Sequence, residues 1–264
     1  MSDHSASAPS AQRGLHAREL TVRYGGLVAN DSVTIDVEPG RVVGLIGPNG
    51  AGKTTFVDAV SGFTAAEGEI TLDGARIDAL PPHERRAAGL SRTWQSGELF
   101  GNLSVAENLL VAARTGGWRT LARDIFVRRR RGAGDEVAAR ALEVVGLDGV
   151  ADTLARDLTL GQQKLVGVAR ALAGGAEVLL LDEPAAGLDS MESQAFAARV
   201  RSIADSGPGI LLIDHDMSLV LGVCDIVTVL EFGKQIFTGT PAEARTDPTV
   251  VAAYLGAPVE ASHA

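Results

Sequence analysis

The sequence predicts an α/β protein built on a parallel sheet. Three aliphatic runs, residues 177–182, 210–214 and 225–232, are typical of strands, and helical stretches separate them. Strands that alternate with helices predict a parallel, doubly wound sheet. The 264 residues, 45% of them hydrophobic, are enough to bury a sizeable core. With 31 glycines and 4% aromatic residues, we expect an aliphatic core and glycine-rich loops.

Composition and charge exclude several classes of protein. The net charge of −9, from 24 basic and 33 acidic residues, argues against a general nucleic-acid binder, which would carry a basic face. The single cysteine, Cys224, excludes a disulfide framework and a cysteine-based zinc site, and it fits a reducing compartment. No apolar run approaches the ~20 residues needed to cross a bilayer, and the first residues lack the apolar segment of a secretory signal. We therefore expect a soluble cytoplasmic protein that binds no nucleic acid.

The first third of the chain is predicted to form a tail, several strands and one helix. Residues 1–12, rich in serine and alanine, are expected to be disordered. Hydrophobic alternation, or a short apolar run bounded by turn residues, predicts each strand. The predicted strands are 15–24, 33–37, 42–46, 69–72 and 90–94. A helix is expected over residues 53–61, directly after a glycine-rich loop.

The middle of the chain differs, because residues 104–156 carry few strand signals and many helical ones. Ser104 and Glu107 form a capping-box pattern at the start of an apolar run. Asp135 opens an alanine-rich helix that is expected to end near Gly146. This block predicts a helical insertion in a sheet protein.

The strongest motif is the glycine-rich loop between the predicted strand 42–46 and the predicted helix 53–61. It matches G-x-x-x-x-G-K-[ST] and consists of Gly47, Pro48, Asn49, Gly50, Ala51, Gly52, Lys53 and Thr54, followed by Thr55. The glycines let successive backbone N–H groups point at a phosphate chain, and the helix adds its positive N-terminal end. Lys53 would bring a charge to the terminal phosphates, and the Thr54 hydroxyl would hold Mg²⁺. The alternative is a glycine-rich turn without a ligand, and its place between strand and helix argues against that.

Two acids end the predicted strand 177–182. Asp182 and Glu183 are expected at the carboxyl edge of the parallel sheet, where ligands bind in such folds. Asp182 would hold Mg²⁺ through water, and Glu183 could polarise an attacking water as a general base. A solvated strand end is the alternative, but the phosphate-binding loop upstream favours the catalytic interpretation.

Three further features lie at strand ends or helix starts, where contact with a phosphate is feasible. Gln95 follows the strand 90–94, His215 follows the strand 210–214, and residues 158–162 read LTLGQ at a predicted helix start. Taken alone, Gln95 would be an ordinary loop residue and His215 a structural histidine. Their order and spacing relative to the loop and the acid pair make the set specific.

With these motifs the chain resembles the ATP-binding subunit of an ATP-binding cassette (ABC) transporter over about residues 13–256. The resemblance implies a P-loop ABC ATPase core with a parallel sheet and a small antiparallel N-terminal β-subdomain. It also implies an inserted helical subdomain at about 97–156 and leaves 257–264 as a C-terminal tail. ATP and Mg²⁺ are the cofactors that it implies.

The resemblance also assigns roles to single residues. Glu183, His215 and Gln95 would act in catalysis, as the catalytic glutamate, the switch histidine and the Q-loop glutamine. Tyr24 would stack on adenine, and Asp189 would belong to the D-loop. The metal would be held by Thr54, Gln95 and Asp182.

The family forms head-to-tail dimers in which the LTLGQ segment of one chain meets the ATP bound by the other. Thr159, Gly161 and Gln162 are therefore expected to bind nucleotide across a dimer. The family usually has Ser-Gly where this chain has Thr159-Leu160, and Phe where it has Trp94. The Thr159 hydroxyl can still reach a phosphate.

Three stretches resemble the branched-chain (hydrophobic) amino-acid uptake group, and they are 91–113, 211–225 and 247–256. Amide or urea importers and the lipopolysaccharide-transport ATPase share much of this pattern, so they remain alternatives. An ABC ATPase without a transport role is a further alternative. One phosphate-binding loop, one cysteine and no heptad array argue against it.

The resemblance implies partners in a membrane. These are permease membrane subunits, an extracytoplasmic solute-binding protein and a second ATP-binding subunit, which is either a copy of this chain or a paralogue. The chain would be peripheral, on the cytoplasmic face of the cell membrane. Residues 96–103, which mix apolar side chains with glycine, are the expected socket for a permease helix. The arginine run 128–131 either contacts lipid head groups or is a solvated helical face.

Overall fold

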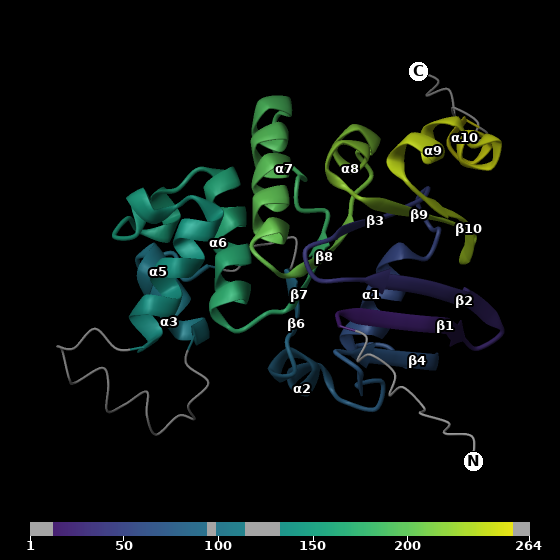
Figure 1. Cartoon of the computed structure of the whole chain (residues 1–264), viewed down its shortest axis with the longest axis horizontal. Coiled ribbons are helices and arrows are strands. Elements are labelled where there is room, and N and C mark those ends of the chain that lie inside the picture. The colour runs from purple at the N-terminus through teal and green to yellow at the C-terminus, as the bar shows by residue number, and fades with distance from the viewer. Residues whose placement is uncertain (1–12, 94–98, 114–132, 256–264) are drawn as a thin grey trace, which may run out of the picture.

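The computed structural model describes residues 13–93, 99–113 and 133–255, and within them the strands form one ten-stranded sheet. Its strand order is β5-β4-β1-β2-β10-β9-β3-β8-β7-β6. Figure 1 shows the sheet with helices packed around it. The α/β class that the sequence predicts is confirmed, while the joining of all strands into a single sheet was not predicted.

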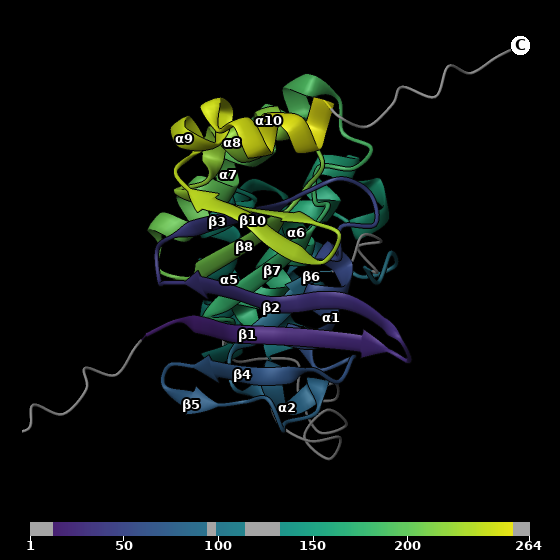
Figure 2. The same ribbon diagram turned by 90° about the vertical axis from the view of Figure 1, so that its right-hand side faces the viewer.

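The antiparallel part of the sheet comes from the start of the chain. Its strands are β1 (Leu15–Tyr24), β2 (Leu27–Val37), β4 (Glu67–Leu72) and β5 (Ala75–Arg76). β1 pairs with β2 on one side and with β4 on the other, both antiparallel. Figure 2 shows these strands stacked below the parallel part of the sheet.

The parallel part consists of β3 (Val42–Ile46), β6 (Leu90–Thr93), β7 (Val178–Asp182), β8 (Gly209–Ile213) and β9 (Ile226–Glu231). β10 (Lys234–Gly239) folds back antiparallel to β9. One residue pair, Lys234 with Asp31, connects β10 to β2 and so joins the two parts of the sheet. The sequence predicted the five parallel strands to within one residue at the ends that the structure describes, and it missed β5 and β10.

Side chains of the parallel strands alternate between two cores. Val42, Leu179 and Leu181 belong to one apolar cluster with the helical block, while Val43 and Leu180 belong to a second with the antiparallel strands. Because both faces of these strands are covered, their sequences are continuously aliphatic instead of alternating with polar residues.

Three helices form a block beside the sheet, at the left of Figure 1: α3 (Val105–Ala113), α5 (Ala133–Val145) and α6 (Leu160–Ala173). Between α5 and α6 lie two short 3₁₀ turns, η1 (Asp148–Val150) and η2 (Ala155–Asp157). The capping box predicted at α3 is present, with the Ser104 amide donating to the Glu107 carboxylate at 2.8 Å and the Glu107 amide to the Ser104 hydroxyl at 3.2 Å. The predicted end of α5 is also found, since Gly146 follows it with a φ of 69°.

The remaining helices cover the faces and far end of the sheet. They are α1 (Lys53–Ser61), α2 (Pro82–Ala87), α7 (Ser190–Asp205), α8 (Met217–Val223), α9 (Pro241–Thr246) and α10 (Pro248–Leu255). Arg85 of α2 is buried against the last turn of α1. Its guanidinium donates to the carbonyls of Ala59 and Val60 at 2.8 and 2.7 Å, and to those of Leu80 and Asp78 at 2.8 and 2.6 Å. Four carbonyl partners satisfy this buried charge, which no motif in the sequence predicts.

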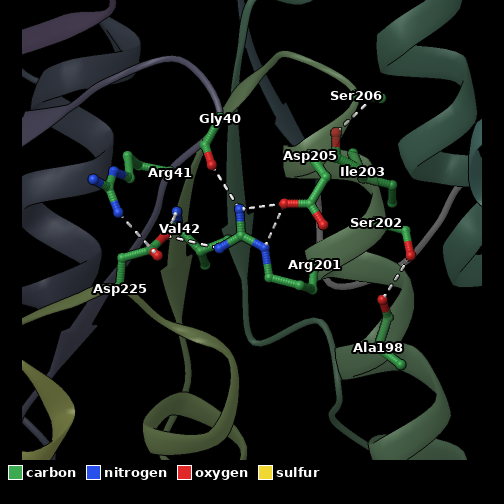
Figure 3. A network of polar contacts seen from close by, with 10 residues as sticks. All are labelled: Gly40, Arg41, Val42, Ala198, Arg201, Ser202, Ile203, Asp205, Ser206 and Asp225. Atoms are coloured by element: carbon green, nitrogen blue, oxygen red, sulfur yellow. Dashed lines mark hydrogen bonds and ion pairs between the residues drawn. The ribbon is translucent and has the colours of Figure 1, made fainter.

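An ion-pair network closes the amino edge of the parallel strands (Figure 3). Arg201 of α7 donates to Asp225 at 2.8 Å and to the Gly40 carbonyl at 2.6 Å, and it pairs with Asp205 at 2.9 Å. Asp225 also accepts from the Val42 amide at 2.8 Å. This network fastens α7 to the starts of β3 and β9.

Candidate active site

The glycine-rich loop connects β3 to α1 and fits closely against neighbouring backbone. Gly47 has a φ of 151°, and a Cβ there would lie 2.2 Å from the Leu230 carbonyl oxygen. Gly52 has a φ of 96°, and a Cβ there would lie 2.5 Å from the Ala29 carbonyl oxygen. Larger residues are excluded at both positions by backbone conformation and by contact with the adjacent strands.

The same loop leaves a cradle that suits a phosphate chain. Gly50, with a φ of 79°, has no atom within 4 Å of a Cβ built on it, so the middle of the loop is open. α1 begins after Gly52 without a side-chain cap, which leaves first-turn N–H groups free to bind an anion. Pro48 and Asn49 complete the loop, Ala51 is buried beneath it, and Thr54 and Thr55 stand in the first turn.

Lys53 closes over this loop. Its Nζ donates to the Gly47 carbonyl at 2.7 Å and to the Pro48 carbonyl at 3.1 Å. Burial lowers the pKa of Lys53 from its ordinary value, while the nearby charges of Glu183 and Asp182 act in the opposite direction. The ammonium group therefore lies between the phosphate cradle and the two acids.

Asp182 ends β7 and is almost fully buried. Arg92 on the neighbouring strand β6 donates to its Oδ2 at 2.7 Å, and the second terminal nitrogen of Arg92 donates to Asp58 at 2.5 Å. The side chains of Arg92 and Asp182 are each 8% exposed, and that of Asp58 is 31% exposed. One guanidinium thus links the carboxylate after β7 to helix α1, which carries Lys53 and Thr54.

Glu183 follows in a strained conformation. Its φ is 46°, a region that non-glycine residues rarely adopt, and its amide donates to the Ile213 carbonyl at 2.7 Å. His215 lies beside it, with Nδ1 4.0 Å from the Glu183 Oε1 and 3.6 Å from the Asp214 Oδ1. These distances are too long for hydrogen bonds, so the exposed imidazole is near the acid without being fixed to it.

The LTLGQ segment starts α6, on the other side of β7 and β8 from α1 in Figure 1. Thr159 and Gln162 form a capping box, in which the Thr159 amide donates to the Gln162 side chain at 3.0 Å. Asp189 has the same function at α7, where its carboxylate accepts from the Glu192 amide at 2.8 Å. A Cβ on Gly161 would lie 3.8 Å from Leu188, so the helix start and the segment before α7 are neighbours.

The structure thus brings together some of the predicted residues and separates others. The carboxyl edge of the parallel strands holds one set of predicted residues, Lys53, Asp182, Glu183 and His215. The starts of α6 and α7 hold the other set, Thr159, Gly161, Gln162 and Asp189. Tyr24 ends β1, is 51% exposed, and places its hydroxyl 3.4 Å from that of Thr64, just beyond α1. Gln95, Trp94 and the arginine run 128–131 lie outside the described residues.

Sequence reasoning missed three side chains that support the site: Arg92, Asn30 and Tyr254. Fully buried Asn30 donates to the Gly52 carbonyl at 3.1 Å and so holds the end of the loop. Burial raises the pKa of Tyr254 on α10 to about 12, and the Gly47 amide opposes the rise. A polar residue within a predicted strand was the available signal at 92, whereas residue 30 lies in the part of β2 that the sequence did not predict.

Comparison with known proteins identifies the family of this chain. Residues 30–186 match the ABC transporter family. The chain belongs to that family. Residues 234–260 also match the family described as branched-chain amino acid ATP-binding cassette transporter. The ABC family, the P-loop α/β fold and the ATPase class predicted from the motifs are therefore confirmed.

Similar proteins span almost the whole of this ABC ATPase. The high-affinity branched-chain amino acid transport ATP-binding protein BraF of Pseudomonas aeruginosa is 40% identical, over 92% of this chain and 97% of that protein. Its counterpart LivG of Escherichia coli is 38% identical, over the same shares of 92% and 97%. The lipopolysaccharide export system ATP-binding protein LptB of Haemophilus influenzae is 33% identical, over 92% and 97%.

A solved structure agrees with the sequence comparisons. The crystal structure of an ABC-transporter ATP-binding cassette in its ADP conformation superimposes with a TM-score of 0.79 at 29% identity, over 92% of this chain and 98% of that one. In the part of the chain that the structure describes, every helix is too short or too polar to cross a bilayer.

Proposed function

We propose that this ABC ATPase hydrolyses ATP to power the import of branched-chain or other hydrophobic amino acids. The observation that carries the chemistry is that Lys53, which begins α1 after β3, and the acids Asp182 and Glu183 at the end of β7 lie at one edge of the sheet. The substrate class is supported by the match of residues 234–260 to the branched-chain family and by the names of the relatives BraF and LivG.

In this proposal the loop and α1 bind the phosphates. Lys53 exchanges its two loop carbonyls for phosphate oxygens, and first-turn N–H groups of α1 contribute further donors. Thr54 and Asp182 would hold Mg²⁺ together with Gln95, and the hydroxyl and carboxylate oxygens present suit this ion. The metal would neutralise charge on the phosphates. Tyr24 is exposed on the strand end that faces Thr64 and would stack on adenine.

Glu183 is the general base of the proposed reaction. Its carboxylate accepts a proton from the attacking water. His215, 4.0 Å away, is near enough to close on the reacting phosphate once the nucleotide is bound. Glu183 and His215 follow β7 and β8, and these strands end at the same edge of the sheet, so neither side chain needs to move far.

The site is proposed to be completed by a second ATP-binding subunit. Leu160 at the start of α6 is exposed, and Figure 1 shows α6 on the other side of β7 and β8 from α1, the helix that follows the phosphate loop. The capping box of α6 binds the Gln162 amide, and the N–H groups before it, which have no partner within the helix, are proposed to meet a phosphate bound by the partner subunit.

Permease membrane subunits are the proposed partners on the cytoplasmic face of the cell membrane, with an extracytoplasmic solute-binding protein delivering the solute. A cavity of about 610 Å³ between β6 and α6 supports this. Leu99 and Phe100, from the segment proposed as the socket, line it, and the Arg170 guanidinium lies 5.5 Å from the centre of the Phe100 ring. The mixture of apolar and basic groups suits the end of a short permease helix.

Lipopolysaccharide export is the second candidate function, and the 33% identity with LptB is the observation that favours it. A transport assay separates the two candidates. The ATPase is reconstituted in liposomes with its membrane partners, and uptake of labelled leucine is compared with release of labelled lipopolysaccharide. ATP-dependent leucine uptake that stops in Glu183→Gln is the expected result. Lipopolysaccharide release without leucine uptake would overturn the proposed import.

The dimer is tested with two inactivating changes. In mixed dimers, Lys53→Ala in one chain and Gly161→Glu in the other place both lesions in the same composite site. One intact site and about half of the bound nucleotide are then expected. Loss of nucleotide from both sites would contradict the head-to-tail arrangement.

A further inference from the structure

We propose that Arg92 is a positioning residue that orients Asp182 for Mg²⁺ and ties it to the phosphate-binding helix α1. This inference rests on the proposed function, because it assumes that Asp182 holds the metal. Arg92 itself touches neither metal nor nucleotide in this proposal. It acts through the two carboxylates that its guanidinium joins.

The first support is the geometry of the bridge. Arg92 donates to the Asp182 Oδ2 at 2.7 Å and to the Asp58 Oδ1 at 2.5 Å, so one planar group fixes two acids from different elements. A guanidinium has donors in a rigid fork and stays charged at every relevant pH, which suits it to hold both at once. With Oδ2 engaged, rotation of the Asp182 carboxylate is restricted, and Oδ1 is the oxygen proposed to face a cation.

The second support is where Asp58 lies. It is four residues after Thr54 in α1, so the two side chains share one face of the helix. Thr54 is the proposed hydroxyl ligand of Mg²⁺, and Asp182 is the proposed carboxylate ligand. The bridge from Asp58 through Arg92 to Asp182 therefore fixes the spacing between the two proposed ligand groups.

The third support is burial and charge. The side chains of Arg92 and Asp182 are each 8% exposed, so the pair is shielded from solvent screening. Lys53 interacts with the charges of both Asp182 and Glu183. Asp182 thus has Lys53 and Arg92 close by, and Arg92 is the one of the two that hydrogen bonds to it.

A residue that orients a metal ligand has a characteristic effect when it is removed. Such changes typically weaken metal binding by about 10–100-fold. We therefore expect Arg92→Met to raise the Mg²⁺ concentration for half-maximal binding of a fluorescent ATP analogue by about tenfold or more. Nucleotide binding in EDTA should stay within about twofold of wild type, because the loop and Lys53 are untouched.

Two variants of the bridge sharpen the test. Arg92→Lys keeps the charge but cannot reach both acids in the same planar geometry, so an intermediate Mg²⁺ midpoint is expected. Asp58→Asn keeps the size of the side chain and an acceptor oxygen but removes the negative charge of one anchor, so a smaller shift in the same direction is expected. Combining Asp58→Asn with Arg92→Met should add nothing to Arg92→Met alone, because the bridge is already gone.

A matched control is available on the same sheet. Arg201→Met removes another guanidinium that joins two carboxylates, at the opposite edge of the parallel strands. Its thermal unfolding midpoint should fall while its Mg²⁺ midpoint stays at the wild-type value. Comparing the two variants separates orientation of Asp182 from a general loss of stability.

The outcomes decide between this inference and the proposed function. If Asp182→Asn leaves the Mg²⁺ dependence of nucleotide binding unchanged, the proposed metal ligand is wrong. If Asp182→Asn shifts it but Arg92→Met and Arg92→Lys do not, Arg92 is structural only and the inference is overturned. A tighter Mg²⁺ midpoint in Arg92→Met also overturns it, since Arg92 would then compete with the metal.

Discussion

The two edges of the parallel sheet each hold an arginine between two carboxylates, yet the two arrangements serve different ends. At the amino edge, Arg201 joins Asp205 and Asp225, and backbone groups of Gly40 and Val42 complete the network (Figure 3). At the carboxyl edge, Arg92 joins Asp58 and Asp182 beside the phosphate loop. Both edges thus use an arginine between two carboxylates, but only the arginine at the carboxyl edge lies beside the proposed ligand site.

The difference follows from the direction of the strands. In an open parallel sheet, ligand crevices lie outside the carboxyl ends of the strands. Asp182 and Glu183 lie at that edge, and Glu183 has a strained backbone with a φ of 46°. Asp225, at the opposite edge, accepts hydrogen bonds at both of its oxygens. The comparison predicts that changes at one edge affect activity and changes at the other affect stability.

The largest expected effect is on catalysis at the carboxyl edge. Glu183→Gln removes the proposed general base and should lower ATP turnover by about 10²–10⁴-fold. Steady-state phosphate release measures it, and binding of a fluorescent ATP analogue is the control that should remain near wild type. Equal turnover in the two proteins would show that Glu183 is not the base.

A second effect concerns the ammonium group of Lys53. Burial lowers its pKa, and bound phosphate would favour the charged form, so nucleotide binding should be linked to proton uptake. Affinity should therefore fall as the pH rises through the lowered pKa, by at most about tenfold per pH unit. Equilibrium titrations between pH 7 and 10 measure this fall.

Two variants control the Lys53 prediction. Lys53→Arg, which stays protonated throughout this range, should bind with little dependence on pH, and Lys53→Ala should bind more weakly at every pH. A wild-type affinity that is constant up to pH 10 would contradict the prediction.

At the amino edge, the expected effect is on stability. Arg201→Met leaves Asp225 and the Gly40 carbonyl without a major partner, and we expect a loss of about 1–3 kcal/mol in the free energy of unfolding. Urea unfolding followed by circular dichroism measures it. Arg140→Met, at an exposed position of α5, is the matched control and should change stability by less than about 0.5 kcal/mol. A large change in nucleotide affinity for Arg201→Met would contradict the prediction that changes at the amino edge affect stability and not activity.

The smallest expected effect is a dependence of the folding stability on pH. Burial would raise the pKa of Asp225, but hydrogen bonds from the Val42 amide and from Arg201 outweigh it and lower the pKa. A lowered carboxyl pKa contributes stability above the unfolded value of about 3.9, and this stability is lost as pH falls through the folded pKa. Wild type should therefore exceed Asp225→Asn in stability at pH 7, with the difference shrinking below about pH 4. Thermal unfolding at several pH values tests this, and a constant difference would contradict it.

The sequence predicts most of the fold because the parallel strands are buried on both faces. Their aliphatic runs, such as 178–182, identify them without any knowledge of their neighbours. The residues of β10, KQIFTG, are half polar, and pairing with β9 is what makes them a strand. The start of β2 was missed for a related reason, since Ser32 has a φ of 53° and interrupts the alternation.

The residues of the site also divide into those that the sequence predicts and those that it does not. Lys53 and the acid pair can be predicted because local motifs carry them, and the structure brings them together from segments far apart in the chain. The partners of Arg92 cannot be predicted, because Asp58 and Asp182 lie 34 and 90 positions away along the chain. The capping functions of Thr159 and Asp189 are visible in retrospect, since Gln162 and Glu192 follow them by three residues.

The buried Arg85 places a positive charge at the C-terminal end of helix α1. The peptide groups of a helix sum to a macrodipole that is positive at the N-terminus and negative at the C-terminus. Arg85 binds the last carbonyls of α1, and the nucleotide is proposed to bind at the opposite end. α1 is therefore polarised in the favourable direction before any nucleotide arrives. Because that field is built into the fold, phosphates bound at the proposed site would meet preorganised dipoles, and binding would require little rearrangement of the helix.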